Sequence, residues 1–210
     1  MPDMSASLLF LGAAAVLAAM PGPGLLFVAG RSIAGGRPEG YATAAGTGLG
    51  GLVHVAAGAL GLSALMMASA TAFGVLKLVG GLYLIWLAVQ TWKSANEPVL
   101  GDDSESAGLK RAFRQAAMVE ATNPKTAAFF LALIPQFVDP ARGSVGIQFM
   151  VLGTISVAMN TTMAAIVATT VSSLRQSAMS RPKLIRRLRQ GSAGLFAGLG
   201  LTLLFARRPA

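Results

Sequence analysis

The stretches Met20-Pro21-Gly22-Pro23-Gly24 and Asn123-Pro124-Lys125 each interrupt a long apolar segment, and they decide the fold. Proline lacks the amide that a helix uses, and it moves the residue before it away from helical angles. In a bilayer such a break is tolerated only where the freed backbone groups face protein or a water-filled cavity. Breaks at matching places of two halves are typical of transporters that bind a solute near the bilayer midplane. The sequence therefore predicts a small membrane transporter.

The composition favours lipid as the solvent of this chain. Of its 210 residues, 54% are hydrophobic and 12% are charged, whereas a soluble domain carries about 25% charged residues. The mean hydropathy is +0.63. A transmembrane helix needs about 20 mainly apolar residues, and the chain contains six such stretches with little sequence left over. We therefore expect an all-α, polytopic membrane protein that forms a single transmembrane domain over residues 1–210.

The six predicted helices fall into two sets of three. They cover approximately residues 5–29, 40–67, 72–91, 109–138, 144–171 and 192–206. A polar linker at about 93–108 separates repeat 1, about 1–92, from repeat 2, about 109–210. Because each half has an odd number of helices, the second half enters the membrane from the opposite side. The expected architecture is a 3+3 inverted repeat in which helices 1 and 4 are broken.

The basic residues predict the orientation of the chain. Most of the 17 Lys and Arg residues lie in the connections after helices 1, 3 and 5, and few lie on the other side. The positive-inside rule then places these three connections in the cytoplasm and both termini outside. This distribution also explains the net charge of +9 without a nucleic-acid partner. Residues 1–20 lack a basic n-region, so we expect them to be a retained helix and not a cleaved signal peptide.

Several kinds of chemistry are excluded by the residue types. The chain has no cysteine, which excludes thiolate metal sites and thiol-redox catalysis. One histidine and eight acidic residues do not suggest a dedicated metal site. The glycines at 46–51 form no nucleotide fingerprint, because no strand precedes them and no Lys-Ser/Thr ending follows. No Ser/His/Asp arrangement is apparent. We expect no metal, no cofactor and no enzymatic activity.

The order of motifs resembles one family along nearly the whole chain. The motifs are Pro21-Gly22-Pro23, Arg31 followed by Gly36, Gly40, Gly46 and Gly50, Lys77 with Gly80-Gly81-Leu82-Tyr83-Leu84, and Asn123-Pro124-Lys125 followed by Phe129-Phe130 and Pro135-Gln136-Phe137. Together they resemble the lysine exporter/threonine–homoserine exporter family. The resemblance implies proton-linked efflux of amino acids across the bacterial inner membrane. Gly24, where the family often has Asn or Asp, and Ala116, where Gly is common, depart from its pattern.

The first break is a candidate substrate site made of backbone. Pro21 and Pro23 remove two amide donors, while Gly22 and Gly24 allow other groups to approach the main chain closely. Half-helix ends expose amides and carbonyls, and an amide end favours a carboxylate. The break is then either half of an amino-acid site or a kink that serves packing.

The second break adds charge. A lysine at the bilayer centre costs about 2.5–3.5 kcal/mol, so Lys125 should face the interior and have a partner. With Asn123 and Pro124 it is a candidate for binding the substrate carboxylate. Glu120, five residues earlier, is a candidate proton carrier, and the alternative is a static ion pair between Glu120 and Lys125.

Three further polar residues lie inside predicted helices. Lys77 either contacts the substrate or extends to the membrane interface. His54 is either a second proton carrier or a hydrogen-bonding partner of a neighbouring helix. Asn160 either lines a polar cavity or bonds between helices. The sequence leaves these alternatives open.

Our hypothesis is a secondary active exporter of amino acids or similar small zwitterions, driven by inward protons. Its expected partners are the lipid bilayer, the substrate and the proton. An exporter of a divalent metal or another small cation on a similar scaffold is the alternative within transport. An intramembrane enzyme and a structural membrane subunit are alternatives of other classes. Neither the identity of the amino acid nor the oligomeric state, a homo-oligomer included, follows from the sequence.

Overall fold

The computed structural model describes residues 4–68, 70–93 and 106–173, together with residues 187, 190, 193, 194, 197, 198 and 201. Every regular element in these residues is a helix, as predicted. The longer helices are α1 (Met4–Ala19), α2 (Pro23–Ala68), α3 (Ala70–Lys93), α4 (Leu109–Ala121), α5 (Pro124–Ala128) and α6 (Val145–Ser173). Most of the predicted sixth helix and most of the predicted linker lie outside the described residues.

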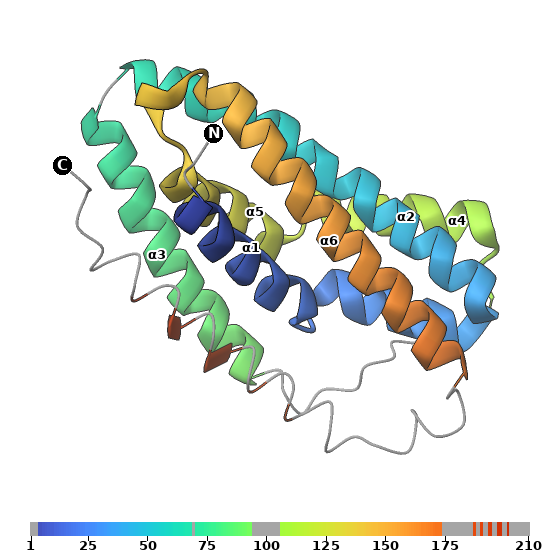
Figure 1. Cartoon of the computed structure of the whole chain (residues 1–210). Helices are drawn as coiled ribbons and strands as arrows, with labels where there is room; N and C mark the ends of the chain where they lie inside the picture. Colours follow the sequence, from blue (N-terminus) through green and yellow to red (C-terminus); the bar gives the residue numbers. More distant parts are fainter. Residues whose placement is uncertain are drawn as a thin grey trace.

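Helix α2 combines the second part of the first predicted helix with all of the second. Its two parts meet at a kink at Gly36, whose φ of 74° and ψ of −166° are not helical. A positive φ favours glycine, and Pro38 follows two residues later, where it suits the start of a new helical segment. The chain therefore reverses direction over a single non-helical residue. In Figure 1, α2 runs away from the end of α1, turns, and returns along the molecule.

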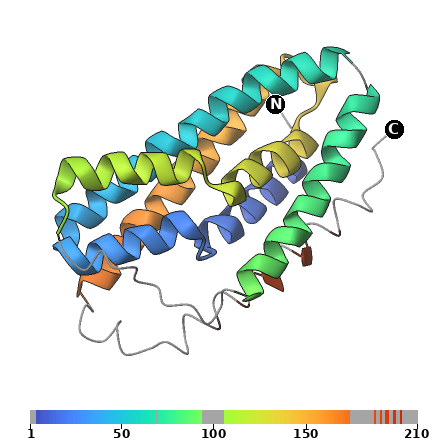
Figure 2. The same ribbon diagram turned by 180° about the vertical axis from the view of Figure 1, so that it is seen from behind.

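The second part of α2 packs against α4 on one side and α6 on another. Glycines allow the close contact with α4. A Cβ placed at Gly46 would lie 2.3 Å from the carbonyl oxygen of Phe113, and one at Gly50 would lie 2.5 Å from that of Ala117. Since neither carbonyl can move without moving α4, these two positions require glycine. Figures 1 and 2 show α6 along the second part of α2 and α4 beside the portion of it that is nearest the turn.

Buried polar contacts also hold α4 to α2 near the kink. Glu39 accepts hydrogen bonds from the Ser106 hydroxyl at 2.5 Å and from the Gly108 amide at 2.7 Å, directly before α4 begins. Arg31 donates from Nη2 to Gln115 on α4 at 2.9 Å. A carboxylate is favourable at the start of a helix, because the free amides there carry partial positive charge. These contacts fix the beginning of α4 against the turn of α2.

The apolar core lies around α1, the segment after α5, and α6. This segment continues as η2 (Phe129–Leu133), a π-helix, and η3 (Ile134–Phe137), a 3-10 helix. Phe10 of α1 packs edge to face on Phe137 with ring centroids 5.4 Å apart, and Phe130 contacts Phe149 of α6 at 6.0 Å. The rings thereby attach the first half of α1 to elements of the second half of the chain.

Many large apolar side chains lie on the outer surface of the helices, as expected for a chain that contacts lipid. Large side chains such as Leu8, Leu9, Leu60 and Met118 are more than 60% exposed. Among the described residues, two helical segments are long and apolar enough to cross a membrane, Pro23–Gly61 with 39 residues and Val145–Ser173 with 29.

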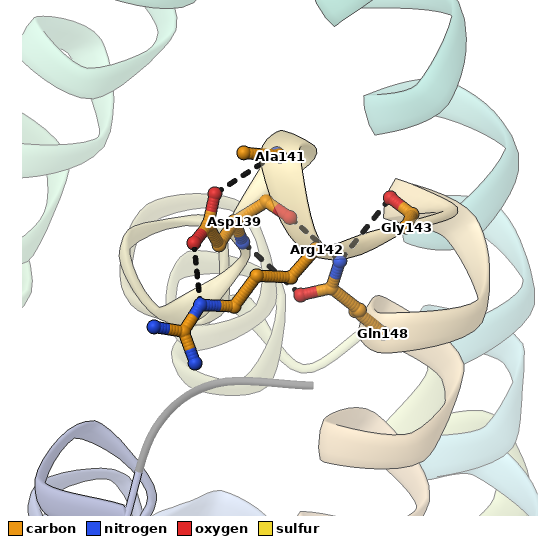
Figure 3. Close-up of polar contacts among 5 residues, drawn as sticks. All are labelled: Asp139, Ala141, Arg142, Gly143 and Gln148. Atoms are coloured by element: carbon orange, nitrogen blue, oxygen red, sulfur yellow. Dashed lines mark hydrogen bonds and ion pairs between the residues drawn. The ribbon is translucent and has the colours of Figure 1, made fainter.

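A compact connection joins η3 to α6. It contains the 3-10 helix η4 (Pro140–Arg142). Figure 3 shows its contacts: Asp139 accepts from the Ala141 amide at 2.9 Å and pairs with Arg142 at 3.0 Å. Gln148 of α6 donates to the carbonyls of Asp139 and Gly143 and accepts from the Asp139 amide. These bonds satisfy the backbone of a turn that has few regular hydrogen bonds.

Candidate functional site

The two breaks lie against each other in the middle of the molecule. Residues 20–22 separate α1 from α2, and residues 122–123 separate α4 from α5. Two glycines of the first break make the close approach possible. A Cβ at Gly22 would lie 2.7 Å from the Lys125 side chain, and one at Gly24 would lie 2.2 Å from a carboxylate oxygen of Glu120. Figure 2 shows α5 beside the junction of α1 and α2.

Lys125 donates to two carbonyls at the end of α1, beside the first break. Its ammonium donates to the carbonyl oxygens of Leu17 and Met20, both at 2.9 Å. In a continuous helix the amide of residue 21 would donate to Leu17, but residue 21 is a proline. The ammonium therefore replaces a missing backbone donor. It also places a positive charge at the carbonyl end of α1, where the helix dipole favours a cation.

Glu120 lies on the other side of the first break, at the start of α2, whereas Lys125 lies at the end of α1. Its side chain is 2% exposed and lies against Gly24 in the first turn of α2, where partial positive charge favours a carboxylate. One oxygen accepts from the Asn123 amide group at 2.9 Å and the other from the Thr126 hydroxyl at 2.5 Å. An Asn or Asp at position 24 would overlap this carboxylate, so the present position of Glu120 requires a glycine at position 24.

Glu120 and Lys125 do not neutralise each other directly. Within the part of the chain that the structure describes, no ion pair joins their side chains. The static ion pair considered from the sequence is therefore not the arrangement found. Each charge instead interacts with a different helix end across the two breaks.

Asn123 and Pro124 begin α5 as well as ending α4. The Asn123 side chain accepts a hydrogen bond from the amide of Lys125 at 3.0 Å, and Pro124 occupies the first turn of the new helix. Asparagine is a preferred N-cap, and proline is favoured at the first helical position because it needs no amide partner there. The pair therefore fixes the direction in which Lys125 leaves the break.

His54 of α2 makes a contact at the second break that matches the contact of Lys125 at the first break. Its Nε2 lies 2.9 Å from the carbonyl oxygen of Glu120, and because a carbonyl only accepts, Nε2 carries the proton. A continuous helix would use the amide of residue 124 here, but Pro124 has none. The structure thus gives His54 the interhelical hydrogen bond, one of the two roles considered from the sequence.

A cavity of about 40 Å³ opens between the breaks and α6. Of the predicted site residues, Glu120, Lys125 and Asn160 line it. The residues of the first break, Asn123, Pro124 and His54 support the charged residues from outside the cavity wall. The side chain of Lys77, whose backbone lies in α3, is outside the described residues. The other lining residues are Ala14, Leu17, Ala18, Thr47, Gly51, Thr126, Phe129, Phe130, Ser156 and Val157.

Sequence reasoning missed the hydroxyl side chains of this cavity. Thr47 donates to the carbonyl of Ala44 at 2.8 Å, and Ser156 donates to that of Leu152 at 3.0 Å. Such bonds within a helix make hydroxyls common in apolar segments, so the sequence gives little signal for them. Their oxygens can still accept from a ligand. The side-chain amide of Asn160 has no hydrogen-bond partner among the described residues.

Comparisons with known proteins identify the family of the chain. The family model described as LysE type translocator matches residues 15–207. A homoserine/homoserine lactone efflux protein of Salmonella typhi is 32% identical over 94% of this chain and 95% of its own length. A Vibrio cholerae protein, named as an uncharacterized membrane protein, is 29% identical over 98% of this chain and 99% of its own. No solved structure matches the chain significantly. With the family model covering nearly all of its length, the chain belongs to the LysE type translocator family.

Proposed function

We propose that this membrane protein exports an amino acid, or a similar small zwitterion, by secondary active transport. The family and the relatives named for efflux support the export of an amino acid. They also favour a transporter over an enzyme. They lend no support to the metal or small-cation alternative. The observation that carries the proposal is the cavity between the breaks, which is lined by one buried cationic and one buried anionic side chain that form no ion pair with each other.

The unused hydrogen-bonding capacity of these two side chains matches a zwitterion. An ammonium has three donors and a carboxylate has about four acceptor positions. Lys125 uses two donors on α1, and Glu120 uses two acceptor positions. One donor therefore remains for a substrate carboxylate, and two acceptor positions remain for a substrate ammonium. The free amide of Asn160 supplies both a donor and an acceptor for a polar group on the substrate side chain.

The size of the cavity favours a short substrate and a conformational change. A site of 10–15 Å³ holds one water, so about 40 Å³ holds on the order of three. A bound amino acid displaces this water and also moves the walls. Ala14, Ala18 and Gly51 in the cavity wall carry at most a methyl group, which leaves room for a short side chain on the substrate. Movement of the walls is what an alternating-access cycle requires.

We further propose a 3+3 inverted repeat in the bacterial inner membrane, with both termini outside. The basic residues near the Gly36 kink and on the first turns of α4 lie on the predicted cytoplasmic side, from which the substrate would enter. The reciprocal contacts of Lys125 and His54 across the breaks support a pseudo-symmetric arrangement. An inward proton would drive the cycle. Glu120 is the favoured carrier because it lines the cavity, and His54 is the second candidate.

The direct test is counterflow in proteoliposomes with a panel of labelled amino acids, L-homoserine among them, with and without an imposed pH gradient. We expect exchange of a small polar amino acid that a pH gradient accelerates. Lys125→Met should abolish this exchange, whereas the exposed Lys110→Met on α4 should not. Absence of exchange for every amino acid of the panel would reject the proposal. An exchange rate that is the same with and without the pH gradient would reject proton coupling alone.

A further inference from the structure

The end of α1 is held to the second half of the chain by one ammonium group. Leu17 and Met20 provide the carbonyls, and Lys125 provides both hydrogen bonds. Leu17 also accepts the Met20 amide at 3.2 Å, a longer bond. About two turns earlier Phe10 packs on Phe137, and α1 also packs along α6. The helix is therefore held by apolar packing along its length and by a charge at its end.

The same ammonium faces the cavity in which we place the substrate. A substrate carboxylate bound to Lys125 would lie next to the carbonyl end of α1, which carries about half a negative charge. The two negative groups would repel each other while they share one cation. A charge-assisted bond to a carboxylate is also about twice as strong as a bond to a neutral carbonyl. The carboxylate therefore competes successfully for the donors of Lys125.

We infer that Lys125 is a capping switch: the carboxylate of the substrate draws its ammonium from the carbonyls of Leu17 and Met20, and the end of α1 is released. This inference rests on the proposed function and adds how binding is coupled to movement. Leu17, one of the two residues whose carbonyls are released, lines the cavity, where water can satisfy its carbonyl. Helix α1 then pivots about the packing of Phe10, which opens the wall formed by Leu17 and Ala18.

The absence of cysteine from the chain makes the release measurable. A thiol introduced by Met20→Cys would be buried, since Met20 is 3% exposed, and it would lie outside the lining of the cavity, so a bound substrate would not cover it. A matched reporter, Ala164→Cys on α6, is 1% exposed and should not respond. The experiment measures the rate at which a water-soluble maleimide labels each thiol in the full-length protein in proteoliposomes.

Two arms test the inference separately from the proposed function. In the first, without substrate, Lys125→Met should accelerate labelling at position 20 on the order of ten-fold. The end of α1 should open more often in this variant, because opening no longer breaks charge-assisted hydrogen bonds. Lys110→Met should leave the rate unchanged. Equal rates in the parent and in Lys125→Met would overturn the inference whatever the substrate is. If Lys125→Met also exposed position 164 and so had unfolded, Lys125→Gln would take its place.

In the second arm, L-homoserine is compared with its lactone, which has the ammonium but lacks the carboxylate. We expect L-homoserine to accelerate labelling at position 20 several-fold and the lactone not to do so. Equal acceleration by both would overturn the inference. Parallel counterflow of labelled L-homoserine distinguishes the two claims. A protein that exchanges L-homoserine without accelerated labelling contradicts the switch and retains the proposed function.

Discussion

Replacement of Gly24 by alanine tests the contact between the two breaks. The new Cβ would lie 2.2 Å from an oxygen of Glu120 and 3.4 Å from the carboxyl carbon of the same side chain. Real Cβ atoms are not found closer than 3.0 Å to other heavy atoms, so the carboxylate must move by about 1 Å. It cannot do so freely, because Asn123 and Thr126 hold its two oxygens at 2.9 and 2.5 Å.

The expected cost follows from these contacts. Overpacking of this kind costs about 1–3 kcal/mol, and loss of one hydrogen bond to a charged group costs about 1.5–3 kcal/mol. The higher helix propensity of alanine offsets about 0.5–1 kcal/mol of this cost. Gly24→Ala should therefore destabilise the protein by about 1.5–5.5 kcal/mol. For a chain of this length, at about 2–4 °C per kcal/mol, that corresponds to a fall in the thermal midpoint of about 3–22 °C. The displaced carboxylate should also weaken amino-acid exchange.

A double-mutant cycle gives the sharpest assay. In a Glu120→Ala background the next atom that the new Cβ meets is Nδ2 of Asn123 at 3.6 Å, an ordinary contact. There Gly24→Ala should cost less than about 1 kcal/mol, so the two substitutions should be strongly non-additive. Gly12→Ala is the control, because a Cβ at Gly12 meets nothing within 4 Å. Thermal unfolding of the four variants in detergent measures the coupling, and additive changes would refute the proposed contact.

Three other substitutions test separate parts of the structure. His54→Ala should lower the thermal midpoint by a few degrees, since it removes one interhelical hydrogen bond worth about 0.5–1.5 kcal/mol, while the Glu120 carbonyl keeps its bond from the Asn123 amide. His54→Gln, which keeps a donor, should recover part of the loss. Gly46→Ala should reduce the yield of folded protein, because its Cβ would meet the backbone of Phe113, whereas Gly61→Ala, in open space, should fold normally. Asn160→Ala should leave the thermal midpoint within about 1 °C and lower amino-acid exchange at least several-fold, which a counterflow assay detects.

The breaks and the helices were predictable from sequence because their causes are local. Pro21 and Pro124 remove amides, and no arrangement of the rest of the chain can restore them. The two prolines also specify which carbonyls lose a donor, those of Leu17 and Glu120, from the four-residue spacing of helical hydrogen bonds alone. What the spacing could not specify was the replacement donor.

That donor comes from far along the chain in both cases. Lys125 reaches a carbonyl 108 positions earlier, and His54 reaches one 66 positions later. The sequence paired Lys125 with Glu120 because they are close along the chain, but side chains bond across breaks only where the fold brings those breaks together. The hydroxyls of Thr47 and Ser156 escaped prediction for another reason. A hydroxyl that bonds to its own helix is ordinary in an apolar segment, and only the fold shows that it borders a cavity.

The central claim is that the two breaks together hold a zwitterion, with its carboxylate on Lys125. Solid-state NMR on protein in lipid tests it most directly, with ¹³C in the carboxyl group of L-homoserine and ¹⁵N in the lysine side chains. A hydrogen-bonded ammonium and carboxylate place these two nuclei about 3–4 Å apart. We predict a carbon–nitrogen dipolar coupling at that distance which Lys125→Met eliminates and Lys110→Met retains. A bound, exchangeable L-homoserine whose carboxyl carbon shows no coupling to a lysine nitrogen, or whose coupling survives in Lys125→Met, would contradict the account.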